Sequence, residues 1–284
     1  MVLVLAVAWA INALLGYGVA GLVIALVVVI IGTFGAYWKS DAVALAMSHA
    51  KPADPVEYAR LHNLVEGLCI AGGLPKPRVY VISDPAPNAF ATGRNPRHAA
   101  VAVTTGLLDK MNRVELEGVL AHELSHVKNY DILVSTLAVT LVGVIVVMAD
   151  FALRFMWWGG PRSRDRQREG GGGPQAIIAL LGILLLLLAP LAARLMQLAV
   201  SRRREALADV SGVAMTRYPP GLIAALEKLK DDTTVVESSS RATAHLWIES
   251  PLARTKEEGR MSRLNRLFET HPPLEERIQA LKEL

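Results

Sequence analysis

The chain has 284 residues, of which 52% are hydrophobic and 20% charged, with 30 Lys and Arg against 26 Asp and Glu. This apolar balance exceeds that of an ordinary soluble domain and predicts a membrane component, with the lipid bilayer as a partner. The basic residues are scattered or lie beside apolar runs without interleaved aromatic residues, so we expect no nucleic-acid partner. The single cysteine, Cys69, excludes an internal disulfide framework and a zinc site built from several thiolates.

Residues 1–38 contain no charged side chain. A run of this length exceeds the roughly 20 residues that one spanning helix needs, so we expect two transmembrane helices that form an N-terminal hairpin. An asparagine and three glycines between positions 12 and 21 weaken a helix and place the break there. A cleaved signal peptide is the alternative. The chain has no basic segment before the apolar run, so we favour retained helices.

The first soluble part is expected to extend over residues 39–131. Asp54 and Pro55 are typical of a helix cap followed by a proline in the first turn. An apolar stripe then continues to Gly72 and Gly73, which are typical of a helix end. This pattern predicts a helix from Asp54 onward.

Two segments with alternating β-branched residues, 78–83 and 99–104, predict strands of a small β-sheet. Between them Asn88, Ala89 and Phe90 open the sequence Asn-Ala-Phe-Ala-Thr-Gly. As an exposed strand at the sheet edge, this segment would bind an extended peptide by main-chain hydrogen bonds. The alternative is an ordinary loop between the strands, which the residues alone favour.

His122, Glu123 and His126 belong to an H-E-x-x-H motif, within a helix that apolar periodicity predicts from residue 114 onward. Two histidines four positions apart lie about 40° apart around a helix, so both imidazoles can reach one zinc ion. Glu123 lies about 100° round from His122, where its carboxylate contacts a water on the metal without joining the ligands. It is therefore the candidate general base. The alternative is a charged helix surface with two solvated histidines.

Two further apolar runs follow, residues 132–158 and 175–200, and each is long enough to span a membrane. They raise the expected number of transmembrane helices to about four. Between them residues 159–174 are rich in arginine and glycine, which predicts a flexible basic loop. A buried helical hairpin in a soluble core is the alternative. If both runs span, this basic loop lies on one side and the basic residues beside the outer ends of the pair lie on the other, so the positive-inside rule does not determine the orientation.

Residues 201–284 form the second soluble part. Glu205 and Asp209 lie four positions apart on a predicted helix, so their carboxylates face the same way. A catalytic zinc takes three protein ligands and one water, and His, His and Glu are a standard set. Glu205 is therefore the candidate third ligand, and Asp209 the candidate partner that orients a ligand histidine. The alternative is a pair of exposed carboxylates that neutralise nearby arginines.

Three segments complete the chain. A Tyr-Pro-Pro-Gly turn predicts a short helix over residues 219–230. Residues 231–260 are polar apart from residues 245–248, which predicts a mobile surface segment that folds over the site. Residues 270–273 are expected to cap a final helix that continues to Leu284.

The order and spacing of these motifs resemble the HtpX-like membrane metallopeptidases, relatives of the CAAX prenyl proteases, over nearly the whole chain. The resemblance implies an α+β, predominantly helical integral membrane protein with a gluzincin-type peptidase domain and a small β-sheet. It also implies one zinc ion per chain, held by His122, His126 and Glu205. Glu123 would be the catalytic base and Asp209 a supporting carboxylate.

The resemblance further implies roles for residues outside the metal-binding motifs. Asn88, Ala89 and Phe90 would align the substrate on an edge strand, His271 would stabilise the oxyanion, and Arg277 would hold the site together. The implied setting is the bacterial cytoplasmic (inner) membrane, with the active site on the cytoplasmic face. There the enzyme would degrade damaged or misfolded membrane proteins and unfolded polypeptides in the stress response. A CAAX-type prenyl protease and an inactive membrane scaffold that keeps zinc for structure are the alternatives.

Overall fold

The computed structural model describes residues 35, 38–39, 41–137, 202–234, 246–248 and 272–284. The chain divides into two compact units, residues 1–39 with 140–194 and residues 40–139 with 195–284. The described residues belong to the second unit, apart from positions 35, 38 and 39. Within these described ranges no helix is both long and apolar enough to cross a membrane. The predicted transmembrane segments, the basic loop and His271 lie outside the described residues, except for positions 35, 38 and 132–137. The predicted division into four parts stays a prediction.

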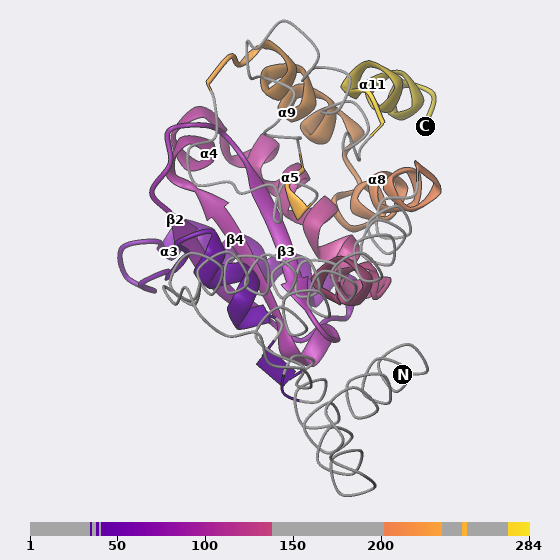
Figure 1. Ribbon diagram of the computed structural model, residues 1–284. Helices are drawn as coiled ribbons and strands as arrows, with labels where there is room; N and C mark the ends of the chain where they lie inside the picture. Colours follow the sequence, from indigo (N-terminus) through magenta and orange to yellow (C-terminus); the bar gives the residue numbers. More distant parts are fainter. Residues whose placement is uncertain (1–34, 36–37, 40, 138–201, 235–245, 249–271) are drawn as a thin grey trace, which may run out of the picture. The chain divides into compact units, whose positions relative to one another are not determined.

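The described part of the second unit is mainly helical with a small sheet, as expected (Figure 1). In chain order its elements are β1 Lys51–Pro52, α3 Ala59–Gly72, β2 Arg78–Ile82, β3 Ala89–Gly93, the 3-10 turn η1 Pro96–His98, β4 Ala99–Thr104, α4 Thr105–Lys110, α5 Arg113–Lys128, α8 Arg202–Thr216, α9 Pro219–Asp231 and α11 Leu274–Lys282. The helices predicted from residue 219 and after residue 273 are confirmed. The helix α8 carries Glu205, the predicted third ligand, and Asp209, its predicted supporting carboxylate.

The sheet has the strand order β1-β2-β4-β3. The two predicted strands are confirmed as β2 and β4, which run parallel with Val79 beside Val101 and Val81 beside Val103. The strand β2 ends at Ile82, one residue before the predicted end. The short strand β1, which was not predicted, pairs antiparallel with β2.

The segment after Asn88 is a strand at the sheet edge, so the loop interpretation is wrong. Its five residues are buried, whereas an exposed strand was expected, and alignment of a substrate by this strand stays a prediction. β3 pairs antiparallel with β4 and is the outermost strand of the sheet. Thr104 fixes the start of the pairing, because its backbone N–H donates to the Asn88 carbonyl at 3.0 Å and its hydroxyl accepts from the Asn88 N–H at 2.9 Å. These contacts across the sheet are absent from any local sequence pattern.

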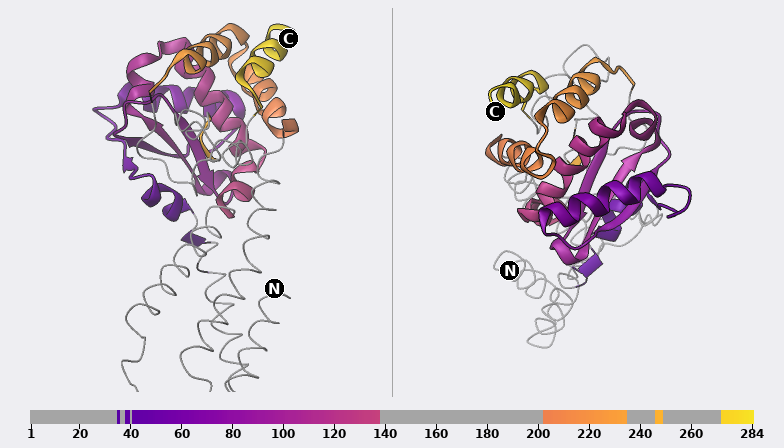
Figure 2. Two further views of the ribbon diagram at one scale, coloured as in Figure 1. Left: turned by 45° about the horizontal axis from the view of Figure 1, so that its top comes forward. Right: turned by 180° about the vertical axis from the view of Figure 1, so that it is seen from behind.

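Both faces of the sheet are covered. On one face the valines of β2 and β4 pack against apolar side chains of α3 and α5, and α3 crosses in front of the sheet in the right-hand view of Figure 2. On the other face Phe90 meets Trp247 edge to face, with ring centroids 4.9 Å apart. Leu246, Trp247 and Ile248 are all buried. The surface interpretation of residues 231–260 is therefore wrong for these three.

The helix α3 begins later than predicted. Residues 55–58 form a turn, and the Asp54 carboxylate accepts from the N–H groups of Val56 and Glu57 at 2.8 and 3.0 Å. Asp54 therefore caps this turn, and the helix starts at Ala59. Cys69 lies on the buried face of α3, and burial raises the pKa of its thiol to about 11.

The helix α5 is fixed at its start by a capping box. The Asn112 side chain accepts from the N–H groups of Val114 and Glu115, while the Glu115 carboxylate accepts from the Asn112 N–H at 2.8 Å. The buried Glu115 also pairs with Lys228 on α9 at 2.7 Å. Glu115 therefore caps the start of α5 and also holds α9 against it. Figure 1 shows α8 and α9 beside α5, with α11 next to α8 and α9.

The helix α5 does not continue into the apolar run that begins at residue 132. It ends at Lys128, and Tyr130 adopts a left-handed conformation with φ of +62°. A separate helical stretch then occupies residues 131–137. Because of this break, the chain changes direction directly after the second histidine of the motif.

Candidate metal centre

The two histidines of the motif lie one turn apart on α5, and Glu205 faces them from α8. The Nε2 atoms of His122 and His126 are 3.2 Å apart. Nε2 of His122 lies 3.5 Å from Oε2 of Glu205, and Nε2 of His126 lies 3.6 Å from Oε1. These side chains form the one group of three in the described ranges whose ligand atoms all lie within 4.8 Å of one another. The structure thus brings together the three predicted ligands.

The separations between these atoms fit a tetrahedral ion. Zinc bonds of about 2.0–2.1 Å at tetrahedral angles place neighbouring ligand atoms about 3.3–3.4 Å apart. The three separations given above, 3.2, 3.5 and 3.6 Å, lie close to this value. Two imidazoles and one carboxylate also leave a fourth position for a water, as in catalytic zinc sites. The donor set and its spacing therefore suit zinc.

The alternatives that placed these residues on the surface are wrong. His122 is fully buried, and Glu205 and Asp209 are each 4% exposed. Asp209 lies four residues after Glu205, and its Oδ1 is 2.8 Å from Nδ1 of His122. It therefore sits where an orienting carboxylate is required, on the nitrogen that faces away from the Glu205 contact.

Arg277 on α11 holds Asp209 with a two-pronged contact. Its Nε donates to Oδ2 at 2.9 Å and its Nη2 to Oδ1 at 2.6 Å. Such a fork fixes the carboxylate in direction as well as in position. The side chain of Arg277 is itself buried, so the pair is shielded from solvent. This arrangement agrees with the predicted role of Arg277 in holding the site together.

The two carboxylates beside His122 oppose the effects of its burial and of the Arg277 charge. Burial favours the neutral form of Asp209, but Arg277 and His122 outweigh burial and lower the pKa of Asp209 to about 2. Burial and the charge of Arg277 act to lower the pKa of His122, yet Asp209 and Glu205 prevail and raise it to about 9. The carboxylates around His122 thus stabilise positive charge at this position.

Ile248 links the edge strand to this network. Its N–H donates to the Ala89 carbonyl at 3.0 Å, and its own carbonyl accepts from Nη1 of Arg277 at 3.5 Å. Asn88 is bonded to β4, so strand alternation turns the backbone groups of Ala89 and Ala91 away from β4. The outer edge of β3 is therefore connected to the metal centre through a single residue.

Two predicted site residues, Glu123 and His271, are not among the three predicted ligands. Glu123 follows His122 on α5, is 2% exposed, and does not belong to the group of converging ligand atoms. A buried carboxylate beside the ligands, and not among them, suits a general base. His271 lies outside the described residues, so its role stays a prediction.

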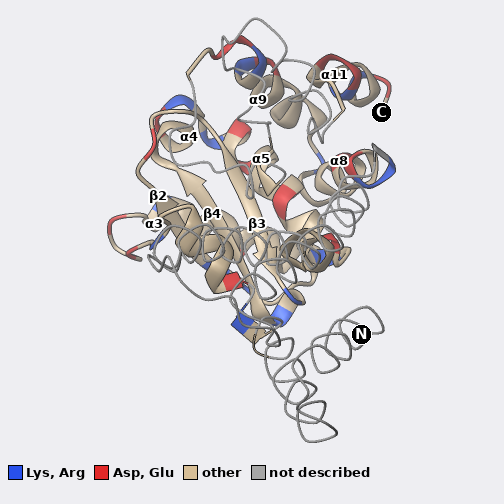
Figure 3. Cartoon of the chain, in the orientation of Figure 1, with Lys and Arg blue, Asp and Glu red and all other residues tan. Residues whose placement is uncertain are grey.

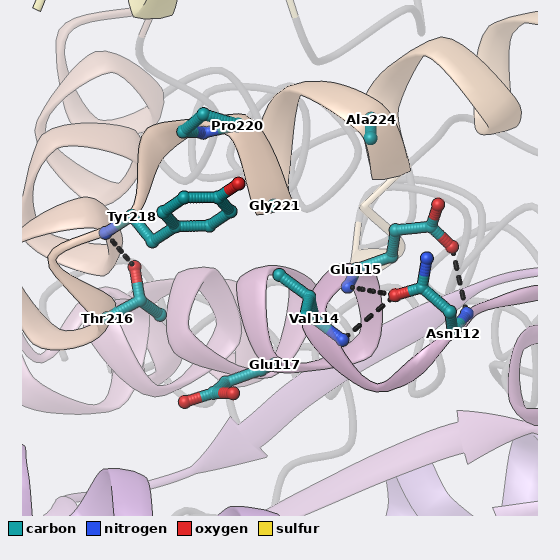
Figure 4. Close-up of a pocket in the computed structure, with 9 residues that line it drawn as sticks. All are labelled: Asn112, Val114, Glu115, Glu117, Thr216, Tyr218, Pro220, Gly221 and Ala224. Carbon is teal, nitrogen blue, oxygen red and sulfur yellow. Dashed lines mark hydrogen bonds between the residues drawn. The ribbon is translucent and has the colours of Figure 1, made fainter.

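A cavity of about 650 Å³ opens at the start of α5, away from the converging ligands (Figure 4). It is lined by Asn112, Val114, Glu115, Glu117, Thr216, Tyr218, Pro220, Gly221 and Ala224. None of the predicted site residues lines it. Its carboxylates belong to the helix cap and to the outer face of α5, so this cavity does not form part of the metal centre.

Sequence reasoning missed Gly212, which sets the distance between α8 and α5. It lies on the same face of α8 as Glu205 and Asp209, at positions i, i+4 and i+7. A Cβ atom on Gly212 would lie 3.0 Å from the backbone nitrogen of His122. The helix carrying the carboxylates therefore packs directly on the backbone of a candidate ligand. A small residue three positions after Asp209 was the available signal.

We expect Gly212→Ala to weaken zinc binding, because α8 must move away from α5 by a few tenths of an ångström. Overpacking of this kind costs about 1–3 kcal/mol, which exceeds the gain of about 1 kcal/mol in helix propensity. Gly67→Ala is the matched control, since a Cβ at this α3 position meets no atom within 4 Å. Zinc affinity and the thermal midpoint should fall only for Gly212→Ala. Equal behaviour of the two variants would contradict this account of helix spacing.

Comparison with known proteins shows which family the chain resembles. The family model described as "Peptidase family M48" matches residues 55–284. A protein named "Protease HtpX homolog" from Thermoanaerobacter pseudethanolicus is 45% identical over 268 residues, which cover 94% of this chain and 86% of that protein. One of the same name from Tropheryma whipplei strain Twist is 48% identical over 248 residues, covering 87% and 80%.

A solved structure, that of S. mikatae Ste24p, is also similar. It has 20% sequence identity and a TM-score of 0.45, over 98% of this chain and 66% of that chain. The family assignment rests on the closer sequence relatives. Their identity and coverage, and the match over residues 55–284, lead to one conclusion: this chain belongs to peptidase family M48.

Proposed function

We propose that this protein is a zinc-dependent membrane endopeptidase that hydrolyses damaged or misfolded membrane proteins. The observation that carries the proposal is the convergence of His122, His126 and Glu205 at separations suited to zinc, beside the buried Glu123. Membership of a peptidase family supports peptide-bond hydrolysis as the reaction. The buried carboxylate next to an incomplete ligand set argues against an inactive scaffold, in which zinc would be fully enclosed by protein ligands.

In the proposed hydrolysis, zinc and the side chains of the protein have separate roles. Bound zinc supplies a Lewis acid that lowers the pKa of a water toward neutrality. Glu123 accepts a proton from the attacking water and then passes it to the leaving amine. Asp209 holds Nδ1 of His122 and keeps that imidazole in the orientation that the ligand position requires. His271 is proposed to donate a hydrogen bond to the oxyanion.

The proposed substrate lies extended along β3. Strands β3 and β4 carry no charged side chain (Figure 3). The Ala89 carbonyl already accepts from Ile248 and the Gly93 N–H donates to Thr136, so the outward groups of Ala91 are the ones proposed to hydrogen-bond a peptide main chain. Such main-chain bonds would align a peptide whatever its side chains, as unfolded substrates of varied sequence require. Asn88, Ala89 and Phe90 are the proposed substrate-aligning residues, and the link from Ala89 through Ile248 to Arg277 supports their closeness to the centre.

The proposed setting is the bacterial cytoplasmic membrane, with the active site on the cytoplasmic face. The charge-free run of residues 1–38 and the apolar runs 132–158 and 175–200 support insertion in a bilayer. The centre would then act on polypeptides that emerge from the membrane. We include a role in the stress response in the same proposal.

The test is zinc content together with casein cleavage, measured on full-length protein purified in detergent without chelators. We expect one zinc per chain and cleavage in the wild type. Glu205→Ala should lose nearly all zinc and cleavage, because two imidazoles alone hold the ion weakly. Glu227→Ala is the control, since this α9 carboxylate is half exposed and makes a surface pair with Lys282 at 3.1 Å. Absence of zinc from the wild type would reject the proposed centre.

Three further outcomes separate the proposed function from its rivals. Zinc without cleavage of casein, or of any damaged membrane protein reconstituted beside the enzyme, would favour the scaffold. Cleavage of a prenylated peptide in preference to its unmodified counterpart would favour a CAAX-type prenyl protease. Preference for a damaged membrane protein over its native form would support quality control.

A further inference from the structure

The nitrogen of His126 that faces away from the converging ligands has its own carboxylate partner. Nδ1 of His126 lies 3.1 Å from Oδ2 of Asp131. The two side chains are 15% and 9% exposed, so the contact is largely protected from water. Asp131 lies outside the H-E-x-x-H motif.

The break in the helix is what brings Asp131 to this position. On a continuous helix a residue five positions after His126 would lie about 140° round the axis, pointing away from the metal face. The chain instead leaves α5 at Lys128 and turns at Tyr130, whose φ is +62°. The next helical stretch, residues 131–137, begins with Asp131. The left-handed residue thus allows the carboxylate to return to the imidazole.

Arg204 lies on the other side of Asp131. Its Nε is 3.8 Å from Oδ1 of Asp131, and its side chain is 25% exposed. Arg204 directly precedes Glu205 on α8, so one short segment supplies both a candidate ligand and a charge for Asp131. Each candidate histidine ligand therefore has a carboxylate with an arginine near it: Asp209 is hydrogen-bonded by Arg277, and Asp131 has Arg204 at 3.8 Å.

We infer that Asp131 is a positioning residue that holds His126 with its proton on Nδ1 and its Nε2 lone pair directed at the metal. Arg204 steadies the Asp131 carboxylate. The inference rests on the proposed zinc site and extends it to a residue outside the ligand set. Metal-bound histidines commonly donate their second N–H to a carboxylate, and loss of that partner weakens metal binding about 10- to 100-fold.

Asp131 and Arg204 lie close in sequence to the two apolar runs. Asp131 directly precedes the apolar run 132–158, and Arg204 follows the apolar run 175–200. The Asp131–Arg204 contact therefore links a residue that precedes one run in the sequence to a residue that follows the other. Zinc affinity should accordingly respond to Arg204→Gln, by several-fold, although Arg204 touches neither histidine in the described contacts.

The test compares zinc dissociation constants, by competition with a chromophoric chelator, for wild type, Asp131→Ser and Asp131→Asn in full-length protein. Serine and asparagine are small polar residues close in size to aspartate, so the helical stretch of residues 131–137 should be kept. Serine is too short to reach the imidazole, whereas asparagine keeps an acceptor without the charge. We expect a 10- to 100-fold loss for serine and a smaller loss for asparagine. The exposed Asp109 on α4 supplies the control variant Asp109→Ser, which should bind zinc like the wild type.

Two readouts distinguish positioning from a structural role. The absorption spectrum of the cobalt-loaded protein should change for Asp131→Ser, because the ligand geometry changes, while the thermal midpoint of the metal-free protein stays the same. Unchanged zinc affinity in Asp131→Ser, or a loss matched by an equal fall in metal-free stability, would overturn the inference. If His126→Ala also binds zinc like the wild type, the proposed centre itself is wrong. If only His126→Ala loses zinc, the centre stands and the inference alone fails.

Discussion

Glu123→Gln is expected to keep one zinc per chain and to lower the rate of casein cleavage by about 10²- to 10⁴-fold, the usual contribution of a general base. Glutamine has nearly the same shape as glutamate but accepts no proton at neutral pH. Glu123 is buried beside the ligands and is not one of the three converging groups, so its charge is not needed to hold the ion. The variant therefore separates metal binding from proton transfer.

Glu117→Gln is the matched control for this substitution. Glu117 lies on the same helix but lines the cavity at the start of α5, so cleavage should stay at the wild-type level. Glu123→Asp keeps the proton acceptor and withdraws it by one methylene, and we expect an intermediate rate. Wild-type cleavage in Glu123→Gln would reject Glu123 as the base, and loss of zinc would show that it takes part in holding the metal.

Arg277→Met is expected to destabilise the peptidase unit by about 3–5 kcal/mol, because it leaves the Asp209 charge buried without its partner. The guanidinium makes two hydrogen bonds to that carboxylate and also contacts the Ile248 carbonyl. Arg277→Lys retains the charge without the fork and should lose less. The measurement is the thermal midpoint of the metal-free protein in detergent, followed by zinc titration.

Lys282→Met on the same helix controls for loss of a positive charge. Lys282 makes an exposed pair with Glu227, and such pairs contribute about 0–1 kcal/mol. A fall in midpoint equal to that of Arg277→Met would contradict the buried-pair account. The double variant Arg277→Met with Asp209→Leu should recover much of the stability. It should not recover zinc affinity, because His122 would still lack its carboxylate.

The sequence predicted best where function depends on spacing within one helix. The distances between His122 and His126 on α5, and between Glu205 and Asp209 on α8, follow from the helical period, so both pairs face as expected. The strands β2 and β4 were also accessible, because they are rich in β-branched residues. The start of α3 was misplaced because a capped turn and a capped helix share the same signals at Asp54.

The sequence alone failed where a residue is defined by a neighbour distant in the chain. The segment Ala89–Gly93 lacks a strong strand pattern and becomes a strand because it pairs with β4. Leu246 to Ile248 lie in a polar region, yet they are buried because Phe90 and Arg277 contact them. Local composition contains no information about these partners.

The sequence by itself therefore determined the ligand types, the candidate base and the family. The tertiary structure decided how closely those groups approach and what holds them: the glycine contact between α8 and α5, the fork from Arg277, and the turn at Tyr130 that returns Asp131 to His126. The physical reason is the range of the interactions. Helical periodicity acts over a few residues and is written in the local order of side chains. Orientation of the metal ligands depends on packing between helices, which only the folded chain provides.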